Sequence, residues 1–407
     1  MQQTRAPRVV LGVAGGIAAY KSCELLRGLT EGGLHVDVIP TPAALEFVGA
    51  ATFEALSGNP VSTGVFSDIP SVRHVRLGQQ ADLVVIAPAT ADLIARMANG
   101  RADDLLASTL LATRAPVLLA PAMHTEMWQH PATQANVATL RERGVIVVGP
   151  AHGRLTGKDT GPGRLAEPAE IYRLARVLLE RPSALPYDLA GLRVVVTAGG
   201  TRELLDPVRF LTNRSSGKQG WALAEVAAAR GADVTLISAN VDRVGPAGVR
   251  LDKVQTALDL EEATVAAAAE ADIVVMAAAV SDFRPTVRRE SKIKKTDAEP
   301  DQIALTKNPD ILAGLVEARA AGELPRELKI VGFAAETGDE AYSVEEYGRQ
   351  KLARKGCEFI VVNDVGVGGA FENDHNAGLI LGADGTTSVI PRGSKHLVAA
   401  QIWDVVG

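Results

Sequence analysis

The sequence predicts two α/β domains, each built on a mainly parallel sheet. Three observations support this fold class: a length of 407 residues, two series of short apolar strands alternating with helical segments, and a proline-containing stretch between the series. A chain of this length exceeds what one hydrophobic core usually supports. We therefore expect a first domain at 1–180, a linker at 181–191 and a second domain at 192–407.

Each series consists of continuous apolar strands separated by helical segments, which indicates a parallel sheet covered on both faces. The linker RPSALPYDLAGL contains two prolines and follows a helix-like segment, IYRLARVLLE. In such folds ligands bind outside the carboxyl ends of the strands. The strands are expected at 8–13, 35–40, 81–88, 115–121 and 145–150 in the first domain, and at 193–200, 232–239, 271–280, 328–336 and 357–364 in the second.

The composition is that of a globular protein, with 47% hydrophobic and 22% charged residues. A net charge of -6 gives no general attraction for nucleic acid. No apolar run approaches the roughly 18 residues that span a membrane, and the amino terminus lacks a signal-peptide pattern. Two cysteines, Cys23 and Cys357, provide no disulfide framework. We expect a cytoplasmic protein that binds small molecules rather than nucleic acid or membrane.

The first expected strand is followed by AGGIAAYKSCELLRGL, in which Gly15 and Gly16 precede a helix. Free N–H groups at a helix start favour phosphate. The spacing is not G-x-G-x-x-G, however, so the turn alone is as consistent with a tight strand-to-helix connection. Two further segments follow later strands at the same sheet edge: APATADLIARMANGRADDLL at 87–106 and APAMHTEMW at 120–128.

Together with His74 in SVRHVRLGQQADL, these segments resemble the flavin-dependent cysteine decarboxylases over roughly residues 7–175. The resemblance implies a flavodoxin-like domain that binds FMN near a subunit contact, with His74 as catalytic base and Met123 and His124 at the substrate. A lone histidine is more often a surface or capping residue, so its role rests on the flanking match. The residues implied to border FMN are Gly15, Gly16, Thr41, Pro88, Ala89 and Thr90.

The family's chemistry explains why a decarboxylase needs a flavin. A carboxylate without a β-carbonyl has no electron sink; the resemblance implies that flavin oxidises the cysteinyl thiol, CO₂ leaves, and the flavin is then reoxidised. Two departures stand out. The family motif PxMNxxMW has His124 in place of asparagine, and the flap GRLTGKDTGPGRLAE (153–167) lacks the family's cysteine. Thr156, Lys158, Asp159 or water remain alternatives for its proton donor, and a plain Gly-rich surface loop remains an alternative for the flap.

The second domain begins with a polar turn before an alanine-rich helix. In TNRSSGKQG, the backbone N–H groups and hydroxyls of Ser215, Ser216 and Gly217 could bind an anion, although Ser-Ser-Gly turns also cap helices without a ligand. Downstream, SKIKKTD (291–297) places lysines near Asp282 and Asp310. Such a charge run is usually a solvated face, but it also suits a nucleoside triphosphate with Mg²⁺.

The motifs GGTRE, NRSSGKQG, AAAVSDF, KIKK and GFAAET resemble the phosphopantothenate–cysteine ligases from about residue 191 to the end. The resemblance implies that CTP activates phosphopantothenate as an acyl-cytidylate with release of pyrophosphate, and that cysteine displaces CMP. Asn213 would hold this intermediate and Lys292 would stabilise the transition state. The implied CTP residues are Ala279, Asp282, Phe283, Lys292, Lys307, Asn308 and Asp310, with Asp282 also a Mg²⁺ ligand and Ser215, Ser216 and Gly217 at the substrate.

Both halves together resemble the bifunctional flavoproteins of coenzyme A biosynthesis. That family implies a homo-dodecamer built from trimeric flavin-domain contacts and dimeric ligase-domain contacts. The Gly-rich loop in 351–371 is expected to close over substrate, or is simply flexible. Two rival interpretations are a nicotinamide-dependent dehydrogenase and a non-catalytic binding subunit. Against the dehydrogenase, neither domain has a G-x-G-x-x-G motif at its first turn.

Overall fold

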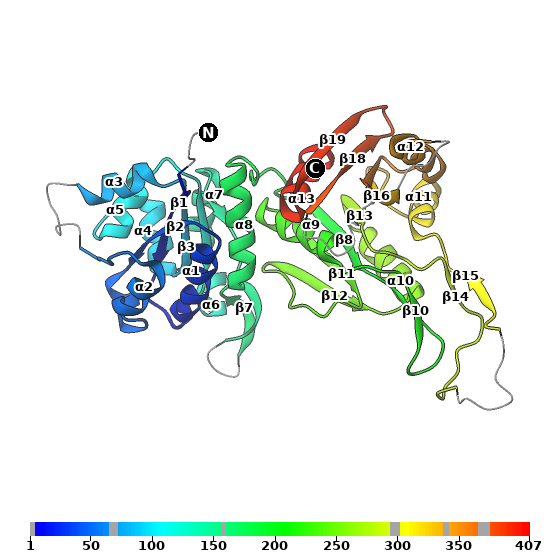
Figure 1. The fold of residues 1–407 in the computed structure, drawn as a ribbon, viewed down its shortest axis with the longest axis horizontal. Helices are drawn as coiled ribbons and strands as arrows, with labels where there is room; N and C mark the ends of the chain where they lie inside the picture. Colours follow the sequence, from blue (N-terminus) through cyan, green and yellow to red (C-terminus); the bar gives the residue numbers. More distant parts are fainter. Residues whose placement is uncertain (1–4, 65–71, 156–158, 294–301, 337–341, 365–374) are drawn as a thin grey trace. The chain divides into compact units, whose positions relative to one another are not determined.

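The computed structural model describes residues 5–64, 72–155, 159–293, 302–336, 342–364 and 375–407. The chain forms two compact units (Figure 1). Unit 1 contains Met1–Asp188 with two short returns, Ala228–Arg230 and Pro246–Gly248, and unit 2 contains the remainder from Leu189 to Gly407. No helix in the described part of the chain is long and apolar enough to cross a lipid bilayer.

Unit 1 is built on a five-stranded parallel sheet in the order β2-β1-β3-β4-β5. The chain direction across the sheet reverses at β1, so β1 and β3 flank the switch point where such folds bind ligands. This topology confirms the predicted α/β class for the first half. The strands are β1 (Arg8–Val13), β2 (His35–Pro40), β3 (Leu83–Ala89), β4 (Val117–Pro121) and β5 (Ile146–Val147).

Helices cover both faces of this sheet because successive strand residues point to opposite sides. Val10, Val84 and Leu119 belong to a core packed under α3, α4, α5 and α7, whereas α1 packs against α2 and α8. The helices are α1 (Lys21–Glu31), α2 (Ala50–Ser57), α3 (Arg73–Gln80), α4 (Ala91–Asn99), α5 (Leu105–Ala112), α6 (Thr125–Gln129), α7 (Pro131–Glu142) and α8 (Pro168–Glu180), with short 3₁₀ turns η1 (Ile17–Tyr20) and η2 (Pro42–Glu46) and a hairpin of β6 (Ala151–Arg154) and β7 (Thr160–Arg164).

Unit 2 contains an eight-stranded sheet in the order β12-β11-β8-β13-β16-β17-β18-β19. Its first six strands are parallel, and β18 and β19 add an antiparallel hairpin. The predicted series of strands included neither this hairpin nor the parallel edge strand β12. Its switch point lies between β8 and β13. The strands are β8 (Arg193–Gly199), β11 (Asp233–Ala239), β12 (Val249–Val254), β13 (Ile273–Met276), β16 (Lys329–Glu336), β17 (Phe359–Asp364), β18 (His375–Gly382) and β19 (Thr387–Ser394).

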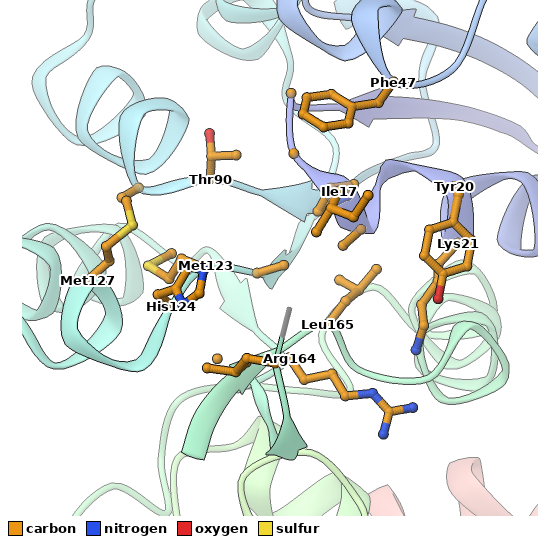
Figure 2. A pocket seen from close by; sticks show the side chains of 18 of the residues that line it. Ile17, Tyr20, Lys21, Phe47, Thr90, Met123, His124, Met127, Arg164 and Leu165 are labelled. Atoms are coloured by element: carbon orange, nitrogen blue, oxygen red, sulfur yellow. The ribbon is translucent and has the colours of Figure 1, made fainter. Parts of the chain in front are cut away.

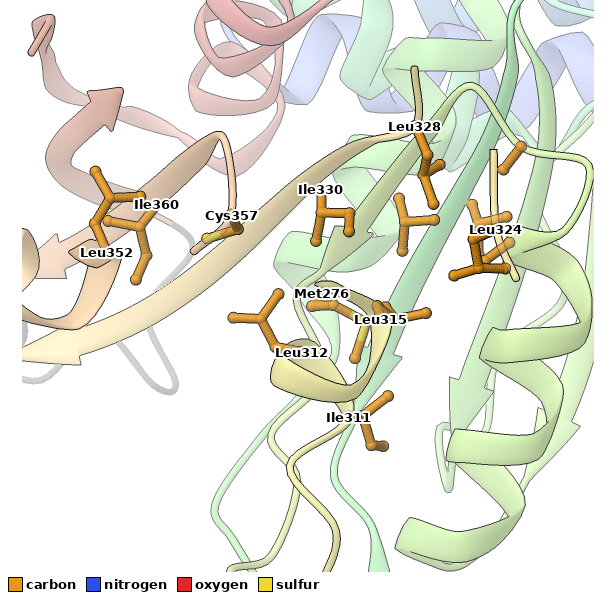
Figure 3. Close-up of a cluster of buried hydrophobic side chains, with 14 of the residues drawn as sticks. Met276, Ile311, Leu312, Leu315, Leu324, Leu328, Ile330, Leu352, Cys357 and Ile360 are labelled. Carbon is orange, nitrogen blue, oxygen red and sulfur yellow. The ribbon is translucent and has the colours of Figure 1, made fainter. Parts of the chain in front are cut away.

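The core of unit 2 joins this sheet to its helices. In Figure 3, Leu315 of α11 lies against Met276 and Ile330 of the central strands. On the other face, Trp403 of α13 donates from Nε1 to the carbonyl of Leu223 in α9 at 3.0 Å. The helices are α9 (Lys218–Ala229), α10 (Ala257–Ala268), α11 (Ile311–Ala321), α12 (Val344–Lys355) and α13 (Lys395–Val406); two small ribbons pair β9 (Arg202–Leu204) with β10 (Phe210–Thr212) and β14 (Phe283–Pro285) with β15 (Leu305–Lys307).

Candidate active sites

Unit 1 contains a cavity of about 650 Å³ at the carboxyl ends of β1, β3 and β4 (Figure 2). This is the edge where the sequence predicted a site. The volume falls in the roughly 300–1,000 Å³ usual for cofactor and small-molecule pockets. The predicted residues that line it are Gly15, Gly16, Pro88, Thr90, Met123 and His124.

Glycines let the backbone approach closely around this cavity. A Cβ on Gly15 would lie 2.5 Å from the Cβ of Ala43, closer than real Cβ contacts allow. Gly163 of β7, with φ +157°, has the Met123 carbonyl 2.2 Å from the position of its missing Cβ, and its own carbonyl accepts from the Met123 N–H at 2.9 Å. The hairpin carrying the flap is therefore fixed by backbone contact to the strand end that presents Met123 and His124.

Two of the predicted FMN residues do not line the cavity. The hydroxyl of Thr41, which is buried, accepts from the N–H of Ala44 at 3.2 Å and so caps η2. Ala89 is fully buried within β3. Thr90 both lines the cavity and caps α4, where its hydroxyl accepts from the Leu93 N–H at 3.4 Å. Thr41 and Thr90 both follow a strand and cap the next helical segment, so the sequence alone does not distinguish the threonine that lines the cavity from the one that does not.

His124 begins α6 with an extended backbone, and its ring makes no capping hydrogen bond. In Figure 2 it lies beside Met123, with Met127 further along the same side of the cavity. The imidazole is exposed and lines the cavity. An imidazole N–H is able to donate a hydrogen bond to a carboxylate, so the predicted role of His124 at the substrate stays a prediction.

His74 lies at the start of α3 and does not line this cavity. Its Nδ1 is buried and makes no hydrogen bond within the described residues. The structure therefore does not bring His74 together with the cavity of its own chain.

Sequence reasoning missed an apolar rim on the cavity. Ile17 and Tyr20 are each 61% exposed, Phe47 is 51% exposed and Met127 is 47% exposed, and all four line the opening. Large apolar side chains gathered at one exposed site mark a ligand or interaction surface. The sequence offered little indication of this rim, because Ile17 and Tyr20 directly follow the Gly15–Gly16 turn, where apolar residues are also common at an ordinary helix start.

Unit 2 contains a smaller cavity of about 170 Å³ at its own switch point. Ser215, Ser216 and Gly217 line it from the turn before α9, and Ala279 lines it from the segment after β13. The Ala279 N–H donates to the Gly199 carbonyl at 2.8 Å, which joins the ends of β8 and β13. The structure thus brings four predicted residues into one pocket.

Two asparagine side chains hold the backbone of the segment that follows Ala279. Asn213 donates from Nδ2 to the Val280 carbonyl at 2.9 Å, and Asn308 donates from Nδ2 to the Ser281 carbonyl at 2.8 Å. Asp282 and Phe283, which follow, are exposed. None of these four residues lines the small cavity, so the structure does not bring them into the pocket that Ala279 lines.

Lys292 and Lys307 are exposed and also lie outside the small cavity. Asp310 caps α11, accepting from the Ala313 N–H at 3.2 Å, and is paired with Lys355. Burial acts to raise the pKa of Asp310, but the hydrogen bonds from Lys355 and the Ala313 N–H, together with the charges of Lys355 and Arg354, outweigh it and lower that pKa. Lys294, Lys295, Thr156, Lys158 and residues 365–371 of the expected closing loop lie outside the described residues.

No cluster of three or more histidine, cysteine or acidic side chains suited to a metal occurs among the described residues. Neither of the two cysteines therefore belongs to such a cluster. Burial raises the pKa of Cys357, and it also raises the pKa of Cys23, where Arg27 partly opposes it. Both thiols are therefore biased toward their neutral form.

Fold and sites together define a flavoprotein with a second α/β domain. Residues 1–178 match the family described as Flavoprotein, and residues 189–407 match the DNA/pantothenate metabolism flavoprotein C-terminal domain. The chain is 62% identical to the coenzyme A biosynthesis bifunctional protein CoaBC of Mycolicibacterium smegmatis over 98% of this chain and 97% of that one. It is 44% identical to the Vibrio cholerae protein of the same name, over 100% and 99%.

Among solved structures, a PPC decarboxylase mutant complexed with pantothenoylaminoethenethiol is 33% identical, covering 43% of this chain and 100% of that one, with a TM-score of 0.41. The full-length identities show that the chain belongs to the family of coenzyme A biosynthesis bifunctional proteins. It is therefore a bifunctional enzyme of coenzyme A biosynthesis, as the resemblance implied, and neither a nicotinamide-dependent dehydrogenase nor a non-catalytic subunit.

Proposed function

We propose that unit 2 joins 4′-phosphopantothenate to cysteine at the expense of CTP, and that unit 1 decarboxylates the product with FMN. The observation that carries this assignment is the placement of a cavity at the switch point of each sheet, lined in both cases by the segments that carry the family motifs. Two separate cavities in two separately packed units support two separate reactions.

The cavity of unit 1 fits FMN in shape and chemistry. Glycine at position 15 lets the turn after β1 pack closely against Ala43. The N–H groups at the start of the helical segment that follows, beside the cavity, would bind the phosphate of FMN. Apolar groups such as Ile17, Phe47 and Leu165 line the rest, as a flat aromatic ring requires. Bound FMN would supply reversible two-electron chemistry, which gives the departing carboxylate an electron sink.

The chain's own residues would bind and orient the substrate. His124 would donate a hydrogen bond to the carboxylate that is lost, and Met123 and Met127 would exclude water beside it. A proton must also be moved at the substrate, and His74 is the side chain that the family pattern assigns to this role.

We propose that His74 reaches the cavity from a neighbouring copy of the chain. Its absence from the lining of its own cavity and the exposed apolar rim of Ile17, Tyr20 and Phe47 both support a covering subunit. A trimer of unit 1 meets this requirement, and trimers linked through paired copies of unit 2 would give the closed dodecamer.

Mixed oligomers test this arrangement. His74→Asn and His124→Leu should each lose CO₂ release, by about 100- to 10,000-fold for the general base. Co-expressed, the two variants should regain part of the activity, because some cavities would combine an intact His124 with an intact His74 from the neighbour. No recovery in mixed oligomers of verified composition would place His74 in its own chain's site.

The ligase assignment rests on the pocket shared by the Ser215–Gly217 turn and Ala279. The turn would bind an anionic group of the acid substrate, Asn213 would hold the acyl-cytidylate, and CTP would lie along the Asp282–Phe283 segment with Lys292, Lys307, Asn308 and Asp310 around it. Mg²⁺ would arrive with the triphosphate, as it usually does, and Asp282 is the exposed carboxylate proposed to contact it.

Purified protein should be yellow, with FMN held non-covalently by unit 1, and should convert 4′-phosphopantothenate, cysteine and CTP to 4′-phosphopantetheine and CO₂. A colourless protein that cannot be reconstituted with FMN would reject the flavin site. Normal flavin content without pyrophosphate release from CTP would reject the ligase assignment alone.

A further inference from the structure

The charged side chains that line the cavity of unit 1 are all cations. They are Lys21, Arg154 and Arg164, and no aspartate or glutamate occurs among the described residues of the lining. The predicted site residues do not include these cations, and the proposed function gives them no role. A cavity whose charged lining has one sign attracts ligands of the opposite sign. This cavity therefore favours an anionic ligand.

Lys21 and Arg164 share a single acidic partner, Glu167. The Nζ atom of Lys21 lies 3.3 and 3.4 Å from the two carboxylate oxygens of Glu167, and a terminal nitrogen of Arg164 donates to the first of these oxygens. No other carboxylate lies within ion-pair distance of either cation in the described part of the chain. One negative charge therefore faces two positive charges, and one positive charge remains uncompensated.

Three elements of unit 1 bring these groups together. Lys21 is the first residue of α1, Arg164 ends β7, and Glu167 is the N-cap of α8. The Lys21 side chain is 12% exposed, so its ammonium has lost much of its contact with water. A lysine in the first turn also meets the positive end of the helix dipole. Burial and the dipole both disfavour the charge of Lys21, and a bound anion would offset both.

The two cations and His124 lie on different sides of the cavity. In Figure 2 the side chains of Lys21 and Arg164 extend toward one side, whereas His124 and Met127 lie on the other. The proposed substrate of unit 1 is anionic at both ends, because it carries the carboxylate that is lost at one end and a phosphate monoester at the other. With the carboxylate at His124, the phosphate would lie toward Lys21 and Arg164.

The two cations suit a phosphate monoester better than a single carboxylate. A guanidinium can donate two parallel hydrogen bonds to phosphate oxygens, and an ammonium adds a compact positive charge. A monocarboxylate would be balanced by the one uncompensated charge. A phosphate dianion can use both cations, in competition with Glu167, so the carboxylate of Glu167 should oppose phosphate binding while it holds the cations near one another.

We infer that Lys21 and Arg164 form a phosphate-binding subsite in the cavity of unit 1. The inference rests on the proposed decarboxylase function for the identity of the ligand. Two phosphate monoesters belong to that reaction: the phosphate at the end of the pantothenoyl substrate and product, and the phosphate of FMN. Both have the chemistry that the subsite recognises, and binding measurements can separate them.

The test compares the full-length protein with Lys21→Met and Arg164→Met, which keep much of the side-chain length and remove the charge. Calorimetry on FMN-loaded protein gives the Kd of the product 4′-phosphopantetheine and of pantetheine, which lacks the phosphate. Reconstitution of the apoprotein gives the Kd of FMN and of riboflavin, which also lacks it. Each substitution should weaken the phosphorylated ligand of one pair about 10- to 100-fold and leave its unphosphorylated counterpart unchanged. Arg101→Met is the matched control, because Arg101 pairs with Asp103 at 2.9 Å and does not line the cavity.

Glu167→Gln separates phosphate binding from a purely structural ion pair. The amide keeps an acceptor for Lys21 and Arg164 but removes the negative charge that opposes phosphate. The phosphorylated ligand should therefore bind at least as tightly as it binds to wild type. Equal weakening in Glu167→Gln and Lys21→Met would show that both variants act through loss of the ion pair, and it would overturn the inference.

A loss confined to 4′-phosphopantetheine assigns the subsite to the substrate, and a loss confined to FMN assigns it to the cofactor. Unchanged preference for both phosphorylated ligands in the two methionine variants overturns the inference. If Lys21→Met fails to fold, Arg164→Met gives the same answer, because the Arg164 side chain is 36% exposed. Because binding needs no turnover, a wild-type protein that prefers the phosphorylated ligands but releases no CO₂ would reject only the proposed decarboxylation.

Discussion

The carboxylate of Asp206 accepts a hydrogen bond of 3.1 Å from the backbone N–H of Ile293, the residue next to Lys292. The same carboxylate receives Nε and a terminal nitrogen of Arg209 at 2.9 and 2.8 Å, and its side chain is 0% exposed. A buried acid in the turn between β9 and β10 therefore holds the backbone of Ile293, next to Lys292, in place, 87 positions along the chain.

Asp206 should contribute stability that disappears in acid. Burial acts to raise the pKa of Asp206, but hydrogen bonds from Val208, Arg209 and Ile293 outweigh it and hold that pKa well below its usual range. A depressed pKa stabilises the fold above the unfolded value of about 3.9 and loses that effect as the pH falls below it. Asp206→Asn should lower the urea midpoint at pH 7, and its difference from wild type should shrink below about pH 4. Asp252→Asn, an exposed control on β12, should show neither effect.

Lys292→Gln should fold normally and lose pyrophosphate release from CTP and 4′-phosphopantothenate, measured without cysteine, by about 100- to 1,000-fold. The reason is that its ammonium would meet the charge that develops as pyrophosphate departs. Decarboxylation of supplied phosphopantothenoylcysteine should be unchanged, because that chemistry belongs to unit 1. The exposed Lys253→Gln is the control. Wild-type pyrophosphate release by Lys292→Gln would reject the assignment.

Gly15→Ala should purify with little or no flavin, because the added Cβ would lie 2.5 Å from Ala43 and would push the turn away from the phosphate. Gly49→Ala, where no atom lies within 4 Å of the new Cβ, should retain its yellow colour. The ratio of flavin absorbance to protein absorbance gives the flavin content of both variants. Full flavin content in Gly15→Ala would show that the turn does not shape the cofactor site.

His124→Asn should keep CO₂ release within a small factor of wild type, because an amide can donate the same hydrogen bond to the substrate carboxylate. His124→Leu, similar in size but without a donor, should lose about 10- to 100-fold in kcat/KM. Flavin absorbance of both variants controls for damage to the cavity. Equal activity of the two variants would mean that His124 makes no contact with the carboxylate.

Much of the fold was predictable because the strand pattern is local. The five strands expected in the first half overlap β1 to β5, and those expected in the second overlap β8, β11, β13, β16 and β17. The β18–β19 hairpin was missed because its strands carry no continuous apolar run: HNAGLILG and TSVIPRGS mix polar, proline and glycine positions. Their pairing depends on β17, which covers one edge of the hairpin.

The candidate sites were predictable where a motif directly follows a strand. Gly15, Thr90 and Met123 line one cavity because the carboxyl ends of β1, β3 and β4 meet at one sheet edge. Thr41 does not line this cavity, and its hydroxyl caps η2. Its place beside FMN stays a prediction. His74 also lies away from the cavity of its own chain, and its assigned role remains a prediction that depends on a second copy.

The sequence by itself determined the two α/β halves, the order of their strands along the chain and the turns at which sites form, since backbone sterics and side-chain alternation act between near neighbours. Only the tertiary structure decided which distant groups share a site. Lys21 and Arg164 meet at Glu167 because α8 packs beside α1, and Asp206 reaches Ile293 across two ribbons. These contacts depend on sheet order and helix packing, which no local pattern encodes, because the groups come within hydrogen-bonding distance only after both cores have formed.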